Sequence, residues 1–242
     1  MSAPAPPAPD TSAGTIRAMF SRIAPRYDLL NRLLSGGTDV AWRREAARLL
    51  APAPGERVLD LCSGTGDLAL AVDRRSGGGA RVVAADFTFE MLVLGQAKLR
   101  RRGARIPEAA ADGLRLPFPD ATFDGATAAF GIRNFEDLDR GLSELCRVLV
   151  PGGRLVVLEF TPEPTGPLAP LVKLHVRRLV PLLGRLVSRD ASAYRYLPDS
   201  VGRWPAPEEL AARMRAAGFA SVGVRRLAFG IAAAHVARKG AP

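Results

Sequence analysis

Cysteine is scarce in this chain of 242 residues, which has only Cys62 and Cys146, far apart in sequence and each in an apolar stretch. Two isolated cysteines give little support to a disulfide framework or to a cysteine-based metal site, and favour a reduced pair in a cytoplasmic protein. Long apolar runs are also missing. None reaches the roughly 18 residues that a membrane-spanning helix needs.

The first ten residues, Met1–Asp10, lack both a basic side chain and a leucine-rich core. They therefore do not look like a secretory signal, and their proline and alanine content is typical of a disordered tail. We expect a disordered segment over 1–14, followed by a single domain over 15–242, a length that suits one α/β domain with a modest extra lobe.

Acidic residues are outnumbered, with 24 Asp and Glu against 34 Lys and Arg, a net charge of +10 and a pI of about 10.8. Such an excess favours an anionic partner such as nucleic acid, acidic lipid headgroups or acidic metabolites, although an arginine-rich surface that serves only solubility is an equal alternative.

The stretch 168–189 contains no acid at all. Its apolar residues recur at helical spacing among basic ones, which predicts either a basic helix on a membrane surface or a helix packed on the core with a solvated back. Pro181 would kink this helix.

Apolar strand-like and helix-like segments alternate through most of the chain, after a mainly helical stretch at 15–50. The predicted strands lie at 57–62, 81–86, 107–111, 123–129, 154–160, 220–227 and 230–237. The predicted helices between and after them lie at 66–75, 88–102, 137–149 and 207–217. This alternation predicts an α/β fold of the Rossmann-like, doubly wound kind. The expected sheet has seven strands, mostly parallel, with an antiparallel C-terminal edge, an N-terminal helical cap and a helical insertion at 161–205.

A glycine-rich turn joins the first predicted strand to the helix after it, in the sequence Arg57–Asp67. Gly64 and Gly66 allow close approach of a ligand to the backbone, and the following helix start offers unpaired N–H groups. Asp86 ends the next strand twenty residues after Gly66, a distance that suits a ribose diol. The turn therefore predicts a site for a nucleoside-containing cofactor.

Acidic residues accompany three successive predicted strands: Asp60 within the first, and Asp86 and Asp112 at the ends of the second and third. They suit a ligand with a cationic amine, a diol and an adenine amine, which describes S-adenosylmethionine better than a dinucleotide with two phosphates. Each acid taken alone could instead cap a helix or form a loop salt bridge. An NAD-linked oxidoreductase, which the loose glycine pattern with Ala69 would allow, and a non-enzymatic basic adaptor for membrane or nucleic acid remain the alternatives.

Five further motifs carry a family resemblance. They are Met19–Asn31, Trp42–Arg44, Asp86–Leu92, Phe130–Asn134 and Tyr194–Ser200. With them the chain resembles the class I S-adenosylmethionine-dependent methyltransferases, in particular the C-methyltransferases that make menaquinone and ubiquinone, over nearly all of Ile16–Lys239.

This resemblance implies cofactor contacts from Thr65, Asp86, Asp112 and Gly113, in addition to Asp60, Gly64 and Gly66 of the strand and turn. It implies S-adenosylmethionine as the cofactor, S-adenosylhomocysteine as the product, and no metal. Two positions depart from the family pattern: Ala129 stands where a cofactor-contacting serine is frequent, and Trp204 where phenylalanine is usual.

The resemblance also implies carbon methylation of a polyprenyl hydroquinone. Demethylmenaquinol is the first expectation, and 2-methoxy-6-polyprenyl-1,4-benzoquinol is the alternative. The expected partners are this quinol and an anionic membrane surface, with no nucleic acid, and a homodimer is left open. The expected location is the cytoplasm, including the inner face of the cell membrane.

Candidates for the chemical step are few. Arg133 is a poor base, but its guanidinium could stabilise a phenolate or hold a water molecule, and Asn134 could orient a quinol hydroxyl. Asp28 could act as a base if the N-terminal helix closes over the site. The ring pocket is expected to contain Tyr27, Tyr194 and Tyr196. His175 lies in the basic helical stretch and is not expected to be catalytic.

Overall fold

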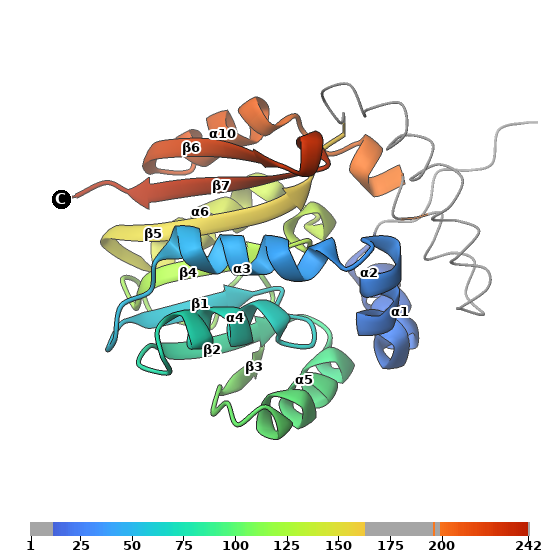
Figure 1. Ribbon diagram of the computed structural model, residues 1–242. Helices are drawn as coiled ribbons and strands as arrows, with labels where there is room; N and C mark the ends of the chain where they lie inside the picture. The colour runs from blue at the N-terminus through green and yellow to red at the C-terminus, as the bar shows by residue number, and fades with distance from the viewer. Residues whose placement is uncertain (1–11, 163–195, 197–198, 242) are drawn as a thin grey trace, which may run out of the picture.

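Seven strands form one sheet in the computed structural model, which describes residues 12–162, residue 196 and residues 199–241 (Figure 1). Their order across the sheet is β3-β2-β1-β4-β5-β7-β6. The strands are β1 (Arg57–Leu61), β2 (Arg81–Asp86), β3 (Glu108–Ala110), β4 (Phe123–Ala129), β5 (Leu149–Phe160), β6 (Phe219–Leu227) and β7 (Ala232–Lys239). The predicted Rossmann-like, mostly parallel sheet is confirmed.

Helices cover both faces of this sheet (Figure 1). The described α-helices are α1 (Ala13–Ile23), α2 (Tyr27–Leu34), α3 (Thr38–Leu50), α4 (Asp67–Arg75), α5 (Phe89–Arg101), α6 (Leu138–Val148) and α10 (Pro207–Ala216). Short 3-10 turns are η1 (Ala24–Arg26), η2 (Ile132–Asn134) and η4 (Ala228–Gly230). Residues of α3, α4 and α5 enter one hydrophobic cluster, and residues of α6 and α10 enter another.

The central strands are apolar on both sides, and successive residues point to opposite faces. On β1, Val58 belongs to the cluster beneath α3 and α4, whereas Leu59 belongs to the cluster beneath α6 and α10. On β5, Val156 and Val157 are divided between the same two clusters in the same order. A strand buried on both faces therefore needs the nearly continuous apolar sequence that these strands have.

The strand order reverses at β1, which pairs in parallel with β2 on one side and with β4 on the other. The connections that leave β1 and β4 run to opposite faces of the sheet, so a crevice opens beyond the carboxyl ends of these strands. This is where the turn at 62–66 and the loop at 130–136 lie.

The last two strands run antiparallel to their neighbours, as the sequence predicts. β7 pairs with β5 along Phe160↔Ala232 to Arg154↔Arg238, and β6 pairs with β7 on the outer side. The final strand of the chain thus lies inside the sheet, and the strand before it forms the edge.

Two strands begin two or more residues away from the predicted position, β7 ends at Lys239 rather than at 237, and the remaining boundaries agree within one residue. β5 begins at Leu149 rather than at 154, because Leu149 pairs with Phe123 and Arg154 pairs with Gly125, so the residues between them bulge out of the ladder. β7 begins at Ala232 rather than at 230, because the 3-10 turn η4 connects it to β6.

The N-terminal helices α1 and α2 form a cap with a small hydrophobic cluster of its own. Its buried residues are Ile16, Met19, Leu30 and Tyr196. Tyr196, which is distant in sequence, thus joins the core of the cap. Ser12 is the N-cap residue of α1, and its hydroxyl accepts a hydrogen bond from the N–H of Thr15. The predicted helical stretch at 15–50 is confirmed.

Most of the predicted tail at 1–14 and of the predicted insertion at 161–205 lies outside the described residues. These two predictions, and the one for a basic helix at 168–189 that contains His175, therefore stay predictions. In the part of the chain that the structure describes, no helix combines the length and the apolar character needed to cross a membrane.

Candidate active site

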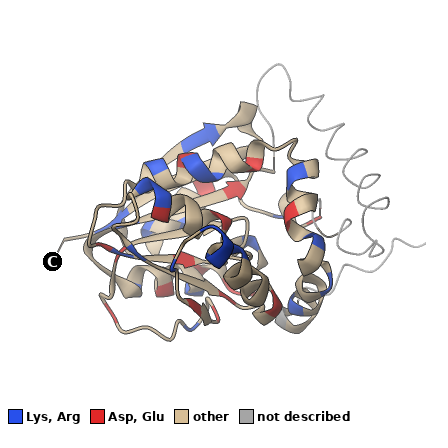
Figure 2. Ribbon diagram, turned by 60° about the horizontal axis from the view of Figure 1, so that its bottom comes forward, with Lys and Arg blue, Asp and Glu red and all other residues tan. Residues whose placement is uncertain are grey.

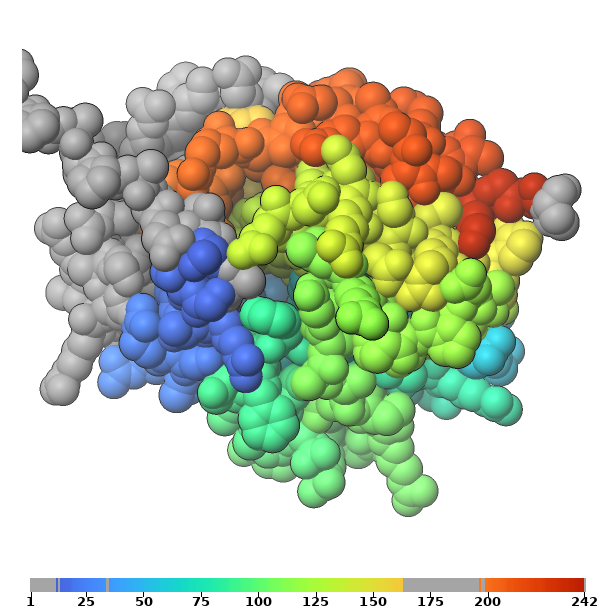
Figure 3. Space-filling view, turned by 180° about the vertical axis from the view of Figure 1, so that it is seen from behind, coloured from blue at the N-terminus to red at the C-terminus, as the bar shows by residue number. Residues whose placement is uncertain are grey.

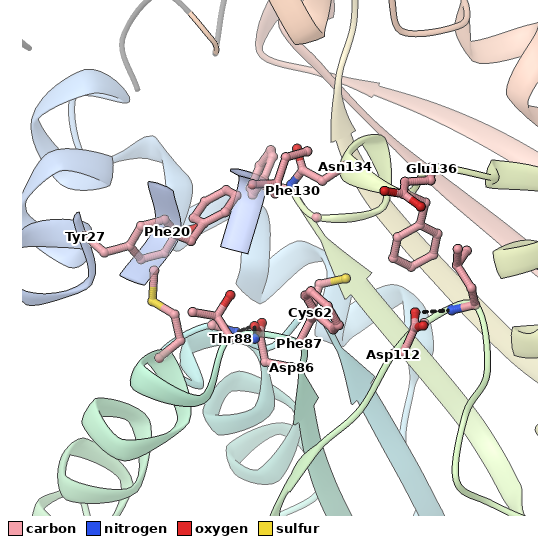
Figure 4. A pocket seen from close by; sticks show the side chains of 17 residues that line it. Phe20, Tyr27, Cys62, Asp86, Phe87, Thr88, Asp112, Phe130, Asn134 and Glu136 are labelled. Atoms are coloured by element: carbon pink, nitrogen blue, oxygen red, sulfur yellow. Dashed lines mark hydrogen bonds between the residues drawn. The ribbon is translucent and has the colours of Figure 1, made fainter. Parts of the chain in front are cut away.

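A pocket lies beyond the carboxyl ends of β1, β2 and β4, and the N-terminal cap closes one side of it (Figure 4). The space between its walls, including the open mouth, is about 820 Å³. In the space-filling view a hollow opens between the cap and the segments that follow these strands (Figure 3). The lining residues are Ile16, Phe20, Tyr27, Cys62, Gly64, Asp86, Phe87, Thr88, Met91, Asp112, Gly113, Leu114, Phe130, Gly131, Asn134, Phe135 and Glu136.

The glycine turn after β1 forms the floor of this pocket. Gly64 has a φ of 55°, in the left-handed region that favours glycine, and its N–H donates to Asp86 Oδ2 at 2.8 Å. Ser63 N–H donates to the Ala85 carbonyl, so the turn is also tied to the end of β2. The turn and the acid at the end of β2 therefore hold each other in place.

Asp86 is buried at the end of β2 and points toward the pocket (Figure 4). Its Oδ1 accepts the N–H of Thr88 at 2.8 Å, opposite the bond from Gly64. Burial raises the pKa of Asp86, and the backbone N–H donors act in the opposite direction. The Thr88 side chain and the Phe87 backbone also bond to this carboxylate, so neighbouring donors from three residues hold Asp86 in place at the pocket.

Asp112 and Gly113 follow β3 on the opposite wall. Asp112 Oδ1 accepts the N–H of Leu114 at 2.9 Å (Figure 4). Gly113 is packed against the Phe135 ring so closely that a Cβ there would overlap the ring. The absence of a side chain at Gly113 thus lets Phe135 form this wall, next to a carboxylate that can accept from an exocyclic amine.

Asp60 is on β1 and does not line the pocket. Its Oδ1 accepts the Thr127 hydroxyl at 2.7 Å, and its Oδ2 has no hydrogen-bond partner among the described residues. Burial raises the pKa of Asp60 to about 7, and Thr127 opposes this shift. The unpartnered oxygen is enclosed by protein, since Asp60 is almost fully buried.

Thr65 and Gly66 complete the turn, and neither lines the pocket. The Thr65 hydroxyl donates to Asp28 Oδ1 at 2.5 Å and accepts from Lys98 Nζ at 2.8 Å. The hydroxyl of Thr65 therefore contacts the cap and α5. Asp28 is likewise not among the pocket-lining residues, because its carboxylate is held between Thr65 and Lys98. The role of Asp28 as a base stays a prediction.

A second cavity adjoins the first and shares Ile16, Asn134, Phe135 and Glu136 with it. Its remaining described lining residues are Arg133, Tyr196, Ser200, Arg203 and Trp204. Asn134 thus lies in the wall between the two cavities. Its Oδ1 accepts the Tyr196 hydroxyl at 2.7 Å, so the loop after β4 and the segment around 196 are joined at this wall.

Arg133 is fixed by a buried carboxylate. Its Nη1 lies 3.0 Å from Glu159 Oε2 and 3.2 Å from Oε1, and it also donates to the Phe130 carbonyl. Burial raises the pKa of Glu159, and Arg133 acts against this shift. The buried Nε of Arg133 has no partner among the described residues and is enclosed by protein, whereas Arg133 as a residue lines the second cavity.

Many of the site residues predicted from the sequence line one of the two cavities. Gly64, Asp86, Asp112 and Gly113 line the first cavity, Tyr27 lines it from the cap, and Arg133, Asn134 and Tyr196 line the second. Tyr194 is outside the described residues. Which of these residues contact cofactor or substrate stays a prediction.

Several residues at or beside the site were not predicted, among them Phe135 and Glu136 in the lining and Glu159 and Lys98 next to it. Glu159 stands out as the acid near the end of the otherwise apolar strand 154–160, and that was a usable signal. Phe135 and Lys98 gave none, since an aromatic loop residue and a helical lysine are common in any chain. Among the described residues there is no group of three or more His, Cys, Asp or Glu side chains that could hold a metal ion.

Charge separates the first cavity from the rest of the molecule. In a chain with a net charge of +10, the described residues lining this pocket include three carboxylates, Asp86, Asp112 and Glu136, and no Lys or Arg. An acidic lining suits a cationic ligand with hydroxyl and amine donors, and it provides no side-chain cation for a diphosphate.

Comparison with known proteins agrees with this geometry. The model of the ubiE/COQ5 methyltransferase family matches residues 10–239. A protein of Thermus thermophilus named demethylmenaquinone methyltransferase is 54% identical over 90% of this chain and 98% of its own length. A Geobacter sulfurreducens protein named ubiquinone/menaquinone biosynthesis C-methyltransferase is 45% identical, over 93% of this chain and 88% of its own.

Among solved structures, a Thermotoga maritima protein described as an S-adenosylmethionine-dependent methyltransferase superposes with a TM-score of 0.65. It is 20% identical and covers 92% of this chain and 99% of its own, a likeness that shows the fold alone. The family match spans nearly the whole chain, and the sheet order is that of the Rossmann-like methyltransferases. The chain therefore belongs to the ubiE/COQ5 methyltransferase family, whose members use S-adenosylmethionine.

Proposed function

We propose that this protein transfers a methyl group from S-adenosylmethionine to a ring carbon of a polyprenyl hydroquinone, with demethylmenaquinol as the acceptor. The observation that carries the proposal is the acidic first cavity, which lies directly beside a second, partly aromatic one. The names of the relatives from Thermus thermophilus and from Deinococcus radiodurans, which is 48% identical, support the choice of acceptor.

The first cavity fits the cofactor by its donor set. Asp86 would hold the ribose diol, and Asp112 with the flat Gly113 wall would hold the adenine. Asp60, which is buried behind the turn and does not line the cavity, would interact with the cationic amino group at longer range rather than by direct contact. When bound, S-adenosylmethionine supplies an electrophilic methyl group and its own positive charge.

The second cavity fits the acceptor ring. Tyr196 and Trp204 give it aromatic walls, while Asn134 in the shared wall can orient a ring hydroxyl toward the first cavity. The Tyr196–Asn134 hydrogen bond fixes the direction of the Asn134 amide, so its N–H₂ group is left to donate to that hydroxyl. Holding both reactants in line could lower the barrier by roughly 7 kcal/mol.

Arg133 would stabilise the acceptor as its phenolate. A guanidinium stays protonated and cannot take the phenolic proton, but its positive charge beside the second cavity can stabilise the resulting oxyanion. Glu159 positions Arg133 for this role. Overall a carbon–carbon bond forms, the carbon–sulfur bond breaks, and the ring hydrogen leaves as a proton to solvent.

A methyl-transfer assay that offers demethylmenaquinol and 2-methoxy-6-polyprenyl-1,4-benzoquinol side by side tests the acceptor. We expect faster transfer to demethylmenaquinol, with the product mass raised by one methyl group on the ring. Preference for the benzoquinol would favour the ubiquinone branch, which the name of the Geobacter relative also includes.

Calorimetry with S-adenosylhomocysteine and with NADH tests the cofactor independently of the acceptor. We expect binding of S-adenosylhomocysteine and none of NADH. Preferential binding of NADH would replace the proposal with an oxidoreductase.

The same proposal covers the organisation of the chain. We propose one methyltransferase domain over 15–242, in which 161–205 serves the quinol and the membrane that dissolves it. A polyprenyl acceptor resides in a bilayer, so a domain that methylates it must reach the membrane surface.

A further inference from the structure

The ammonium group of Lys98, on α5, is surrounded by three oxygens from three other segments. Nζ lies 2.8 Å from Asp28 Oδ2 on α2, 2.8 Å from Thr65 Oγ1 in the glycine turn and 2.7 Å from Asp67 Oδ1 at the start of α4. An ammonium group has three donors, and these contacts use all of them. One side chain thus joins the cap, the turn and two helices.

These contacts are partly buried. The side chain of Lys98 is 16% exposed, and those of Asp67 and Asp28 are 18% and 38% exposed. Burial alone would raise the pKa of Asp67, yet the charge of Lys98 and its hydrogen bond hold that pKa below its usual value. Solvent therefore screens this cluster less than an ordinary surface ion pair.

A second part of the network runs from the cap to α3. Arg32 on α2 donates to Asp67 Oδ2 at 2.9 Å and also pairs with Asp39 Oδ2. Arg43 of α3 pairs with the same oxygen of Asp39. The charges in the whole network balance, with Lys98, Arg32 and Arg43 facing Asp28, Asp67 and Asp39.

The cap segment that Lys98 holds also forms a wall of the cofactor pocket. Tyr27 lines the pocket and immediately precedes Asp28 in the chain. Its Cε1 would lie 3.6 Å from a Cβ placed on Gly64, so the ring rests against the glycine turn. A shift of Asp28 must therefore move the Tyr27 ring relative to the turn.

We infer that Lys98 is a positioning residue that fixes the cap on the cofactor turn, an inference that rests on the proposed use of this pocket by S-adenosylmethionine. Lys98 does not line either described cavity and acts through Asp28 and Thr65. Without its charge, Asp28 would lose its ion pair with Lys98 and Asp67 would keep only Arg32, so two carboxylates near Thr65 would share a single cation. Repulsion between them would loosen the wall that carries Tyr27.

The variant Lys98→Met tests this inference by the affinity for S-adenosylhomocysteine, measured by calorimetry. We expect binding weaker by about tenfold, the change that 1.4 kcal/mol produces. The KM for S-adenosylmethionine should rise by a similar factor, while kcat at saturation falls by less than about threefold, because binding rather than the chemical step is affected. Lys98→Arg should restore most of the affinity.

Arg101→Met is the matched control. Arg101 is on the same last turn of α5 and is exposed, and its Nε bonds to the carbonyl of Ala97 in its own helix. The control therefore removes the same charge from α5 without touching the cap. We expect it to bind S-adenosylhomocysteine as the parent does.

A double-mutant cycle with Asp28→Asn separates positioning from general destabilisation. If Lys98 acts through Asp28, the two changes together should weaken binding hardly more than either alone. Asp28→Asn leaves Lys98 paired with Asp67, so it carries the test even if Lys98→Met does not fold.

The inference would be overturned if Lys98→Met and Asp28→Asn bound S-adenosylhomocysteine within about twofold of the parent, because that difference is too small for a lost ion-pair contact. A large fall in kcat with unchanged affinity would overturn it as well. A parent protein that fails to bind S-adenosylhomocysteine would instead remove the proposed function, and the two failures are thereby distinguished.

Discussion

Gly131 lies so close to Cys62 that a Cβ on Gly131 would overlap the Cβ of Cys62. We expect Gly131→Ala to lower the free energy of unfolding by about 1–3 kcal/mol, the usual cost of overpacking. Urea unfolding measures this change. The backbone of Gly131 is compatible with alanine, since its φ is −128°, so the effect comes from the contact alone.

Cys62→Gly provides the control for this contact. Cys62 has a φ of 56°, where glycine is favoured, so this change alone should cost little. In the double variant the added methyl group meets no Cβ, and stability should return close to that of Cys62→Gly. A double variant as unstable as Gly131→Ala would show that the crowding arises elsewhere.

Asp60 makes the stability of the protein depend on pH. Its pKa is about 7 in the folded protein, against an ordinary value of 3.8, with burial as the main cause. Between about pH 4 and pH 7 the folded protein holds a proton that the unfolded chain has released, so stability falls as pH rises through this window. The slope from one such group reaches at most about 1.4 kcal/mol per pH unit.

Urea unfolding of the parent and of Asp60→Asn at pH 5, 6 and 7 checks this expectation. The parent should lose more stability across the window than the variant. Glu108 also has a pKa raised by burial, to about 7, so some slope should persist in Asp60→Asn. Equal slopes for the two proteins would show that Asp60 does not hold the proton.

At this scale the sequence could predict residues whose position follows from strand ends. Asp86 and Asp112 belong to that group, because parallel strands bring their carboxyl ends to one edge of the sheet. The side-chain pairs that hold other residues of the site could not be predicted. The pairing of Arg133 with Glu159 depends on side-chain directions across two strands, and the contact of Asp28 with Lys98 depends on how the cap settles on the sheet.

The cap is an element with its own small core, separate from the two clusters that pack on the sheet. We therefore expect a chain that starts at Gly37 to keep a folded sheet, with cooperative unfolding seen by circular dichroism. The same truncation removes Ile16, Phe20 and Tyr27 from the cofactor pocket. Affinity for S-adenosylhomocysteine should fall by at least about tenfold, as for the loss of one binding wall.

A truncated protein that unfolds without cooperativity would show that the sheet needs the cap. One that binds S-adenosylhomocysteine like the parent would show that the cap wall does not contribute to binding. Calorimetry and circular dichroism on the same sample separate these results.

Most elements were predictable because the apolar pattern of each is regular. The strands at 81–86 and 123–129 match the observed ones, since glycine-rich turns or loops delimit them. The early start of β5 was not predictable, because Pro151–Gly153 is typical of a turn that ends a helix. Pairing of Leu149 with Phe123 extends the ladder beyond that bulge, and such pairing is a property of two segments rather than of one.

Over the described helices, strands and loops, basic and acidic residues are interspersed along the ribbon (Figure 2), while the net charge of the chain is +10. We expect the protein to float with anionic vesicles in a density gradient and to be released as salt rises, because screening weakens the attraction to acidic headgroups. Neutral vesicles are the control. Equal recovery with neutral and anionic vesicles would remove the idea of an electrostatic membrane contact.

The position of β7 between β5 and β6 has a consequence for biosynthesis. β7, which is synthesised after the other described strands, supplies Ala232, Ala233, Ala234 and Ala237, all buried in the interior of the sheet. Until it emerges, β5 has an unpaired apolar edge that can recruit strands from other nascent chains. A stalled or prematurely terminated product should therefore aggregate rather than form a smaller working enzyme, so the cell obtains activity only from completed chains.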